Sequence, residues 1–365
     1  MPVSVHMFPG QGDFPVQTLY RAAAEDGALR RHLRAVYREI DDEIGEIGET
    51  GDKSGAAGLA GWLLGENPPG GRELAQAAVG VQQLAHYGAA VGWHRTLVER
   101  HGPPDALLAV SFGELAALTA AGAWTVGAGA RAALGLARVL MPDRASGERA
   151  PDGLTLLDRG EAAAAALIAR AGTGRVVVGC VNSPVECVLG GPVEELAAVE
   201  RLAAEEGAQA VRLRLPFGSH HPELFRQRAE FEAALRAGPH PGRPVLPVYS
   251  AVAGRCYTGQ DDLLARAADC LVRPAHLPRV LALLDAHGHT HYREAGPGTA
   301  LGRNAADCLR GTGAHVAGHL TGTDTSTRLG ADVRLDAPAR IDALARLDVD
   351  AAGSPGGHPP KGAHR

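Results

Sequence analysis

The sequence predicts an α/β protein in which a smaller α/β unit interrupts a larger one. Three observations lead to this fold class. A short apolar strand at 3–8 ends in the glycine-rich loop "PGQG", and a buried strand at 106–110 leads into a helix at 114–121. Between 153 and 215 the pattern runs strand, helix, strand, strand, helix, strand. This order, with short connections, is typical of a compact unit inserted into a larger domain.

The larger unit is built from the remaining segments. Pro9, Gly10 and Gly12 end the first strand, because proline and glycine favour tight turns. Apolar residues at helical spacing predict helices over 15–45, 72–100 and 275–288, and "GETGDKSGAAG" and "GENPPGG" are expected as surface turns. The helix around "AQAAVGVQQLAHYGAAVGWHRTL" is expected to face the core and to lead into the strand before Ser111.

The inserted unit has the ferredoxin-like pattern of elements. Its strands are expected in "GLTLLD", "RVVVGCVN", "ECVLGG" and "AQAVRLRL", and its helices in "GEAAAAALIARAG" and "VEELAAVERLAAEEG". We therefore expect a catalytic domain at 1–151 and 216–320 and an insert at 152–215. A C-terminal extension at 321–350 and a disordered tail at 351–365, rich in glycine and proline, should follow.

Composition excludes several classes of protein. Hydrophobic residues make up 45% and charged residues 21% of the 365 residues, as in an ordinary globular protein. The formal net charge of −5 argues against a nucleic-acid partner. No stretch is apolar enough for a membrane span or a signal peptide, so we expect a cytoplasmic protein. The five cysteines form no ligand-like cluster, which predicts free thiols and no metal site.

Ser111 lies in "LLAVSFGELAAL", between the expected strand and helix. A serine at such a junction, with Gly113 two residues later, is typical of a nucleophile at a sharp strand-to-helix turn. The first glycine of the usual Gly-x-Ser-x-Gly pattern is Ala109 here. The motif alone fits a helix cap as well as a nucleophile, so it needs support from other segments.

That support comes from motifs that are far apart in the chain. "FPGQG", "SFGE" at 111–114 and "SHHPEL" at 219–224 resemble, in order and approximate spacing, the acyl-carrier-protein transacylase family. This family includes malonyl-CoA:acyl carrier protein transacylase and the acyltransferase domains of polyketide synthases. The resemblance continues through "VNSPVECVLGG", "PVLPVYSAVAGR" and "EAGPGTAL". It implies an α/β-hydrolase-like large domain with a ferredoxin-like insert.

The resemblance also implies roles for individual residues. Ser111 would attack a thioester carbonyl, and His220 would take up its proton and return it to the leaving thiol. His221 is expected to be a bystander. The backbone N–H groups of Gln11 and Phe112 would form the oxyanion hole. A backbone carbonyl four residues before Pro274, that of Cys270, would hold the histidine ring in place of a carboxylate.

Two positions depart from the pattern of family members that handle malonyl groups. Those members have an arginine where Ala137 stands here, to pair with the free carboxylate. Arg138 follows one residue later, about 100° around the helix, and could take that role only if the helix register shifts. Val110 stands where the family usually has histidine. Both changes favour an acyl pocket for a larger or less polar group, since a buried carboxylate without a partner is costly.

The stretch "FGSH" at 217–220 resembles the substrate-correlated tetrapeptide "YASH" of the family. Phe217 and Gly218 are therefore expected at the acyl pocket, where Gly218 could add volume. The alternative is that Gly218 only allows a tight loop before the next helix. The sequence does not decide between these two interpretations.

The sequence thus predicts a free-standing, trans-acting acyltransferase of secondary metabolism with a ping-pong acyl-enzyme mechanism. Its substrate would be a non-malonyl acyl group, such as an aminoacyl or starter group, carried by coenzyme A or by a phosphopantetheinyl acyl carrier protein. No bound cofactor is expected. Arg144, Arg149 and Arg303 are candidates for docking an acidic carrier protein. The alternatives are malonyl or methylmalonyl transfer, hydrolysis of acyl carrier proteins, and an inactive docking partner.

Overall fold

The computed structural model describes residues 3–12, 14–45, 58–141, 152–213, 215 and 217–317. All of them belong to the first of two compact units, Met1–Val333. The expected extension at 321–350 and tail at 351–365 lie outside the described residues, as does most of the turn expected at 48–58.

A six-stranded sheet forms the centre of the larger domain. Its strands, in spatial order, are β11 (His315–Ala317), β10 (His291–Glu294), β1 (Ser4–Phe8), β2 (Ala106–Ala109), β7 (Val248–Ser250) and β8 (Arg255–Cys256). All neighbours pair in parallel except β7 and β8. Four consecutive residues of β1 and all four of β2 are buried, as expected for central strands of a parallel sheet. The carboxyl ends of β1 and β2 therefore lie side by side.

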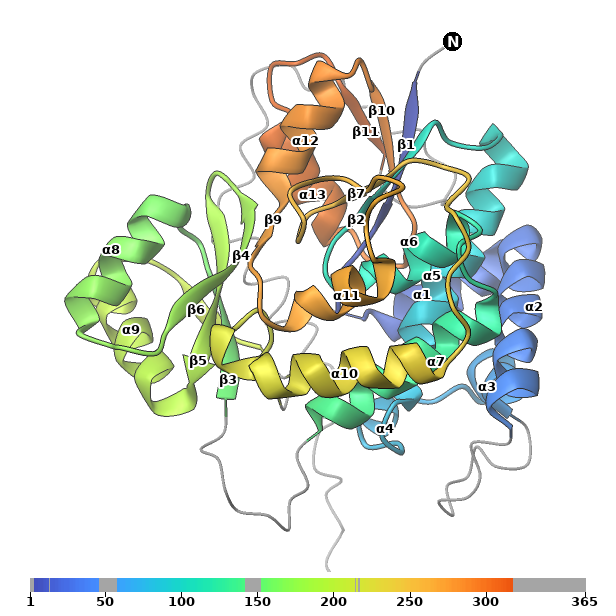
Figure 1. The fold of residues 1–365 in the computed structure, drawn as a ribbon, viewed down its shortest axis with the longest axis horizontal. Helices are drawn as coiled ribbons and strands as arrows, with labels where there is room; N and C mark the ends of the chain where they lie inside the picture. Colours follow the sequence, from blue (N-terminus) through green and yellow to red (C-terminus); the bar gives the residue numbers. More distant parts are fainter. Residues whose placement is uncertain are drawn as a thin grey trace, which may run out of the picture. The chain divides into compact units, whose positions relative to one another are not determined.

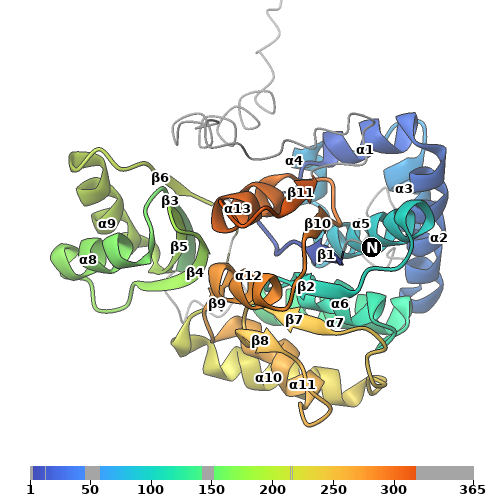
Figure 2. The same ribbon diagram turned by 90° about the horizontal axis from the view of Figure 1, so that it is seen from above.

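Helices cover both faces of this sheet. Figure 2 shows α5 (Val81–His101), α6 (Gly113–Ala120) and α7 (Val126–Leu140) on one side, and α12 (Leu277–Ala286) and α13 (Ala300–Cys308) on the other. The remaining helices are α1 (Val16–Glu25), α2 (Gly27–Ile44), α3 (Gly58–Leu64), α4 (Gly71–Ala75), α10 (Phe225–Ala237) and α11 (Leu263–Ala268), with short 3₁₀ turns η1 (Pro222–Leu224) and η2 (Asp269–Leu271). In Figure 1, α10 runs from the small sheet toward α7, which it contacts.

Two of the helices expected from the sequence are interrupted. The segment at 15–45 is two helices, because the Asp26 carboxylate accepts the backbone N–H groups of Ala28 and Leu29 and so caps α2. The segment at 72–100 divides into α4 and α5 at Gly80, which has φ +94°. Only glycine adopts this conformation readily.

The inserted segment folds as its pattern predicts. β3 (Asp152–Leu157), α8 (Glu161–Ala171), β4 (Val177–Ser183), β5 (Glu186–Pro192), α9 (Val193–Glu205) and β6 (Ala210–Arg212) form a sheet with the order β6-β3-β5-β4. This confirms the ferredoxin-like topology. Both helices lie on one face of that sheet (Figure 2) and enclose a separate core.

One strand of the small sheet comes from outside the insert. β9 (Ala275–His276) pairs in parallel with the edge strand β4. This strand could not be predicted, since two residues before a helix carry no period-2 pattern. The segment that follows the inserted unit therefore returns to it directly before α12.

Within the described ranges, no helix is both long and apolar enough to cross a bilayer. All five cysteines lie in these ranges and are free thiols, as predicted.

Candidate active site

Ser111 lies at the turn between β2 and α6. Its backbone has φ +53°, in the left-handed region that residues other than glycine rarely adopt. Such conformations cost free energy and persist where the surrounding structure imposes them. The turn directs the serine outward at the carboxyl end of the sheet, as the strand-turn-helix pattern predicted.

Close backbone packing imposes this turn. A Cβ at Gly113 would lie 2.7 Å from the carbonyl oxygen of Pro9 and closer still to that of Phe8, so only glycine fits at the start of α6. A Cβ at Gly10 would lie 3.3 Å from the Cβ of Ser111. Gly10 and Gly113 therefore serve one purpose, because they let the loop after β1 approach the serine turn.

His220 also has a left-handed backbone, with φ +55°. Its loop is tied to η2, because the N–H of His221 donates to the carbonyl of Leu271 over 2.9 Å. A Cβ at Gly179 in β4 would lie 3.2 Å from the Cβ of His220, so the small sheet also packs closely on this loop. The inserted domain thus helps to fix the histidine.

The side chains of Ser111 and His220 form a hydrogen-bonded pair. Nε2 of His220 lies 2.7 Å from Oγ of Ser111, and Nδ1 lies 2.7 Å from the carbonyl oxygen of Arg273. Because a carbonyl only accepts, Nδ1 must carry the proton, which leaves the lone pair of Nε2 to accept the serine hydroxyl. Burial lowers the pKa of His220, and the bond to the Arg273 carbonyl raises it in part. The neutral imidazole can act as a general base.

The carbonyl expected from Cys270 is the wrong one. Cys270 is the middle residue of the η2 turn, whereas the chain leaves this turn at Val272 and Arg273. Arg273 precedes Pro274, and a residue before proline is biased away from helical conformation. Its carbonyl is therefore available to the histidine ring, in the orienting role assigned to Cys270.

The two expected oxyanion donors are free of other partners. Among the described residues, no acceptor is bonded to the backbone N–H of Gln11 or to that of Phe112. Phe112 is buried, so an unused N–H there is costly unless a ligand accepts it. Both donors belong to the segments that Gly10 and Gly113 bring together.

His221 has a structural role, as expected. Its Nε2 lies 2.7 Å from the carbonyl oxygen of Arg175, and its Nδ1 accepts the N–H of Glu223 over 3.2 Å. Both ring nitrogens are therefore used in holding the start of η1.

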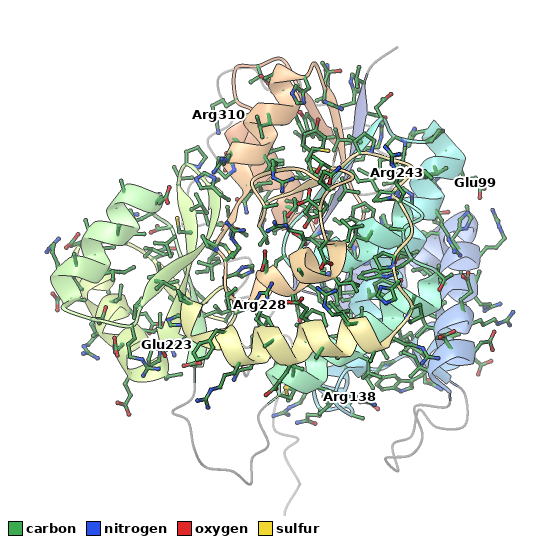
Figure 3. The ribbon with its side chains drawn as sticks, in the orientation of Figure 1. Glu99, Arg138, Glu223, Arg228, Arg243 and Arg310 are labelled. Carbon is green, nitrogen blue, oxygen red and sulfur yellow. The ribbon has the colours of Figure 1, made fainter. Side chains whose placement is uncertain are left out.

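The two positions near the end of α7 face in opposite directions. Ala137 is fully buried, and a Cβ at Gly80 would lie 3.7 Å from the Cβ of Ala137, so this position faces the start of α5. Arg138 is exposed, and Figure 3 shows it at the lower rim of the view, beyond the helices. The alternative in which Arg138 turns inward is therefore wrong. The helix register keeps it on the outer face.

The other expected pocket residues occupy three different environments. Val110 is partly buried directly before Ser111, and Phe217 is buried in the main core. A Cβ at Gly218 would lie 3.0 Å from the Cβ of Asp152 at the start of β3. This contact favours the tight-loop interpretation of Gly218 over added pocket volume.

Sequence reasoning missed three polar side chains near the turn. Glu114 is buried and accepts hydrogen bonds from the hydroxyls of Ser250 and Tyr257, the latter over 2.7 Å. Burial raises its pKa to about 7. Gln83 and His86 are buried on α5. Their signal in the sequence is two polar residues, three positions apart, in the part of the helix expected to face the core.

In the part of the chain that the structure describes, no three histidine, cysteine or acidic residues are placed to bind a metal ion. A strained serine, a histidine held by a backbone carbonyl, and two N–H groups on adjoining segments are the arrangement expected of a serine–histidine acyl-transfer site on an α/β fold.

Comparison with known proteins agrees with this class. Residues 77–266, about half of the chain, match the model of the acyl transferase domain, and the chain belongs to this family. It is 31% identical over 215 residues to the spectinabilin polyketide synthase system protein NorA' of Streptomyces orinoci, which covers 58% of this chain and 6% of that protein. It is 28% identical over 201 residues to the polyketide biosynthesis protein ThaF of Burkholderia thailandensis, which covers 55% of this chain and 17% of that protein. The chain therefore spans a small part of the length of these relatives.

Solved structures show the same fold. A malonyl-CoA:acyl carrier protein transacylase from Xanthomonas oryzae pv. oryzae superposes with a TM-score of 0.70 at 23% identity, covering 84% of this chain and 92% of that one. A malonyl transacylase in complex with its type II polyketide synthase acyl carrier protein has a TM-score of 0.69 at 18% identity, covering 84% and 93%.

Proposed function

We propose that this chain is an acyltransferase that moves a non-malonyl acyl group onto or between acyl carrier proteins, through an ester on Ser111. The observation that carries the proposal is the hydrogen-bond chain from the Arg273 carbonyl through His220 to Ser111. Membership of the acyl transferase domain family and a fold shared with a transacylase bound to its carrier protein support it.

The geometry fits two successive thioester exchanges. In the first, Oγ of Ser111 attacks the thioester carbonyl while Nε2 of His220 takes the hydroxyl proton. The N–H groups of Gln11 and Phe112 would stabilise the oxyanion of the tetrahedral intermediate. The carbon–sulfur bond then breaks, and His220 returns the proton to the leaving thiolate. In the second exchange, the thiol of the acceptor gives its proton to His220 and attacks the ester. The bond from the acyl carbon to Oγ then breaks, and His220 returns the proton to Oγ of Ser111.

The walls of the site argue against a dicarboxylate donor. A malonyl group would bring a free carboxylate next to Ser111, and burying it without a cation is costly. Ala137 is buried where the resemblance implies an arginine, and Arg138 is exposed. Val110 adds a further apolar side chain directly before the serine. These substitutions support a donor without a terminal carboxylate.

For carrier-protein docking, the structure describes one of the three candidate arginines. Arg303 lies partly buried on α13, whereas Arg144 and Arg149 lie outside the described residues. Action in trans on a separate carrier protein remains part of the proposal.

Intact-protein mass spectrometry tests the proposal. The protein is offered malonyl-CoA, acetyl-CoA and carrier proteins loaded with acyl or aminoacyl groups, with Ser111→Ala as the control. We expect a mass increase from neutral donors that is absent in the control, and transfer to a carrier thiol when one is added. Release of free acid in place of transfer would identify a hydrolase. Rapid malonyl loading, unchanged in Arg138→Ala, would contradict the non-malonyl assignment.

A further inference from the structure

Two buried polar side chains on α5 have no hydrogen-bond partner. Gln83 is 6% exposed and His86 is 3% exposed, and neither forms a hydrogen bond to any residue that the structure describes. Among the described residues, the side-chain atoms that are both fully enclosed and unpartnered include the amide nitrogen of Gln11 but no atom of Gln83 or His86, so the polar atoms of this pair keep access to open space beside α5. Two polar side chains, three residues apart on one helix and open to this space, can hydrogen-bond a ligand that enters it.

The contacts of His86 place it beside the site. Its ring stacks on Phe14 with 5.2 Å between ring centroids and contacts Phe112 with 5.4 Å between centroids. Phe112 directly follows Ser111, and Phe14 follows the loop that carries Gln11. His86 therefore lies between the two segments that supply the oxyanion donors.

Gln83 extends this surface toward the end of α7. Residues three apart on a helix are neighbours on one face, so Gln83 is next to His86. Gly80, three residues earlier on α5, faces Leu134 and Ala137 of α7. The face from Gly80 to His86 thus runs from the buried Ala137 position to the serine turn.

A third unpartnered group lies on the opposite segment. The side-chain Nε2 of Gln11 is buried and has no hydrogen-bond partner among the residues that the structure describes. Gly10, directly before it, is close enough that its Cβ would lie 3.3 Å from that of Ser111. The amide donor of Gln11 and the polar pair on α5 therefore flank the same serine turn.

We propose that Gln83 and His86 form the polar end of the acyl pocket, and that the acyl group carries an uncharged group that both donates and accepts hydrogen bonds, a hydroxyl or a carboxamide. This inference rests on the proposed function, because it concerns the group carried by Ser111. It specifies the chemistry of that group, whereas the proposed function only excludes a malonyl group.

The hydrogen-bonding groups of Gln83 and His86 favour an uncharged group that both donates and accepts. Burial lowers the pKa of His86 to about 4, and no charged neighbour adds to this effect. The ring is therefore neutral near pH 7, with one donor and one acceptor, and the amide of Gln83 also offers both. A carboxylate could use only the donors of this pair and would find no cation among Gln83 and His86 to balance its charge, and an ammonium group would lose its hydration without an anion. A hydroxyl or carboxamide matches both side chains.

The test compares matched donors on one enzyme. Butyryl, 3-hydroxybutyryl, 4-hydroxybutyryl and succinyl groups are presented as coenzyme A thioesters and on a carrier protein, and the rate of acylation of Ser111 is followed by intact mass. We expect at least one hydroxyacyl donor to react about tenfold faster than butyryl, and succinyl to react slowest. Gln83→Leu and His86→Leu should each reduce the hydroxyacyl preference to less than about threefold.

Gln82→Leu is the matched control, since Gln82 is adjacent to Gln83 but about 100° away on the helix. It should leave the ratio unchanged. Because each ratio compares two donors on the same protein, a change in the folded fraction cancels. If the butyryl donor and both hydroxybutyryl donors acylate the unmodified enzyme at equal rates, this inference is overturned and the proposed function is not. Failure of every donor to acylate Ser111 would overturn the proposed function as well.

Discussion

Ser111 and His220 share an unusual backbone conformation, and their side chains meet. Their φ angles are +53° and +55°, and Oγ of Ser111 lies 2.7 Å from Nε2 of His220. In the described part of the chain, they are the only residues other than glycine with positive φ. Strain of this kind is kept where it serves function, so both conformations are best explained by the pair that they form.

Replacing His220 should slow acylation without preventing folding. His220→Ala removes the base that accepts the serine proton, and general-base catalysis contributes about 10²–10⁴-fold. We expect the rate of Ser111 acylation to fall by about this factor, measured with a donor that acylates the unmodified enzyme. His221→Ala is the comparison, because His221 only holds its loop. An equal loss in both variants would show that loop structure, and not proton transfer, sets the rate.

The pH dependence of acylation should reflect the buried histidine. Burial lowers the pKa of His220 below its usual value of 6.5, so the neutral base persists to lower pH than in an exposed imidazole. The rate should fall as the pH drops through this lowered pKa, because protonated Nε2 cannot accept the serine proton. Measuring kcat/KM between pH 4.5 and 8 checks this. An inflection above 6.5 on the acidic limb would contradict the assignment.

Gly113 should tolerate no side chain. In Gly113→Ala the new Cβ would overlap the carbonyl groups of Phe8 and Pro9, which belong to β1 and its loop and cannot move freely. We expect a loss of about 1–3 kcal/mol in the free energy of unfolding, measured by urea denaturation, together with slower acylation. Gly174→Ala is the control, since a Cβ there meets nothing within 4 Å. Equal stability of the two variants would contradict the close approach.

The sequence predicted those parts of the fold that rest on local pattern. The ferredoxin-like order of the insert and the strand-turn-helix around Ser111 both follow from periodicity and glycine placement. It could not predict which carbonyl faces His220, since that depends on where η2 ends and on the bias imposed by Pro274. Gln83 and His86 were missed for a different reason. Burial is ordinary for residues on a core-facing helix. These two side chains stand out only once the structure shows that they form no hydrogen bond to a described residue.

The buried carboxyl of Glu114 should make stability fall with rising pH. Its pKa is raised from 4.5 to about 7 by burial, although the hydroxyls of Ser250 and Tyr257 donate to it. Between these two pH values the folded chain holds a proton that the unfolded chain has lost. The contribution of Glu114 to the free energy of unfolding therefore decreases as the pH rises from 4.5 to 7, by on the order of 3 kcal/mol. Glu114→Gln cannot ionise and should remove this contribution.

Glu294, also buried with a pKa of about 7, has the same sign of effect and remains in the variant. The buried histidines His6, His86 and His94, whose pKa values burial lowers, contribute with the opposite sign. The difference in the free energy of unfolding between Glu114→Gln and the unmodified protein should therefore change by on the order of 3 kcal/mol in favour of the variant between pH 4.5 and 7. Urea denaturation at several pH values, for the unmodified protein, Glu114→Gln and Glu294→Gln, separates the two carboxyls. If Glu114→Gln kept the full slope, the carboxyl of Glu114 would have to ionise at its ordinary pKa. Its position between α6, Ser250 and Tyr257 would then have to be hydrated.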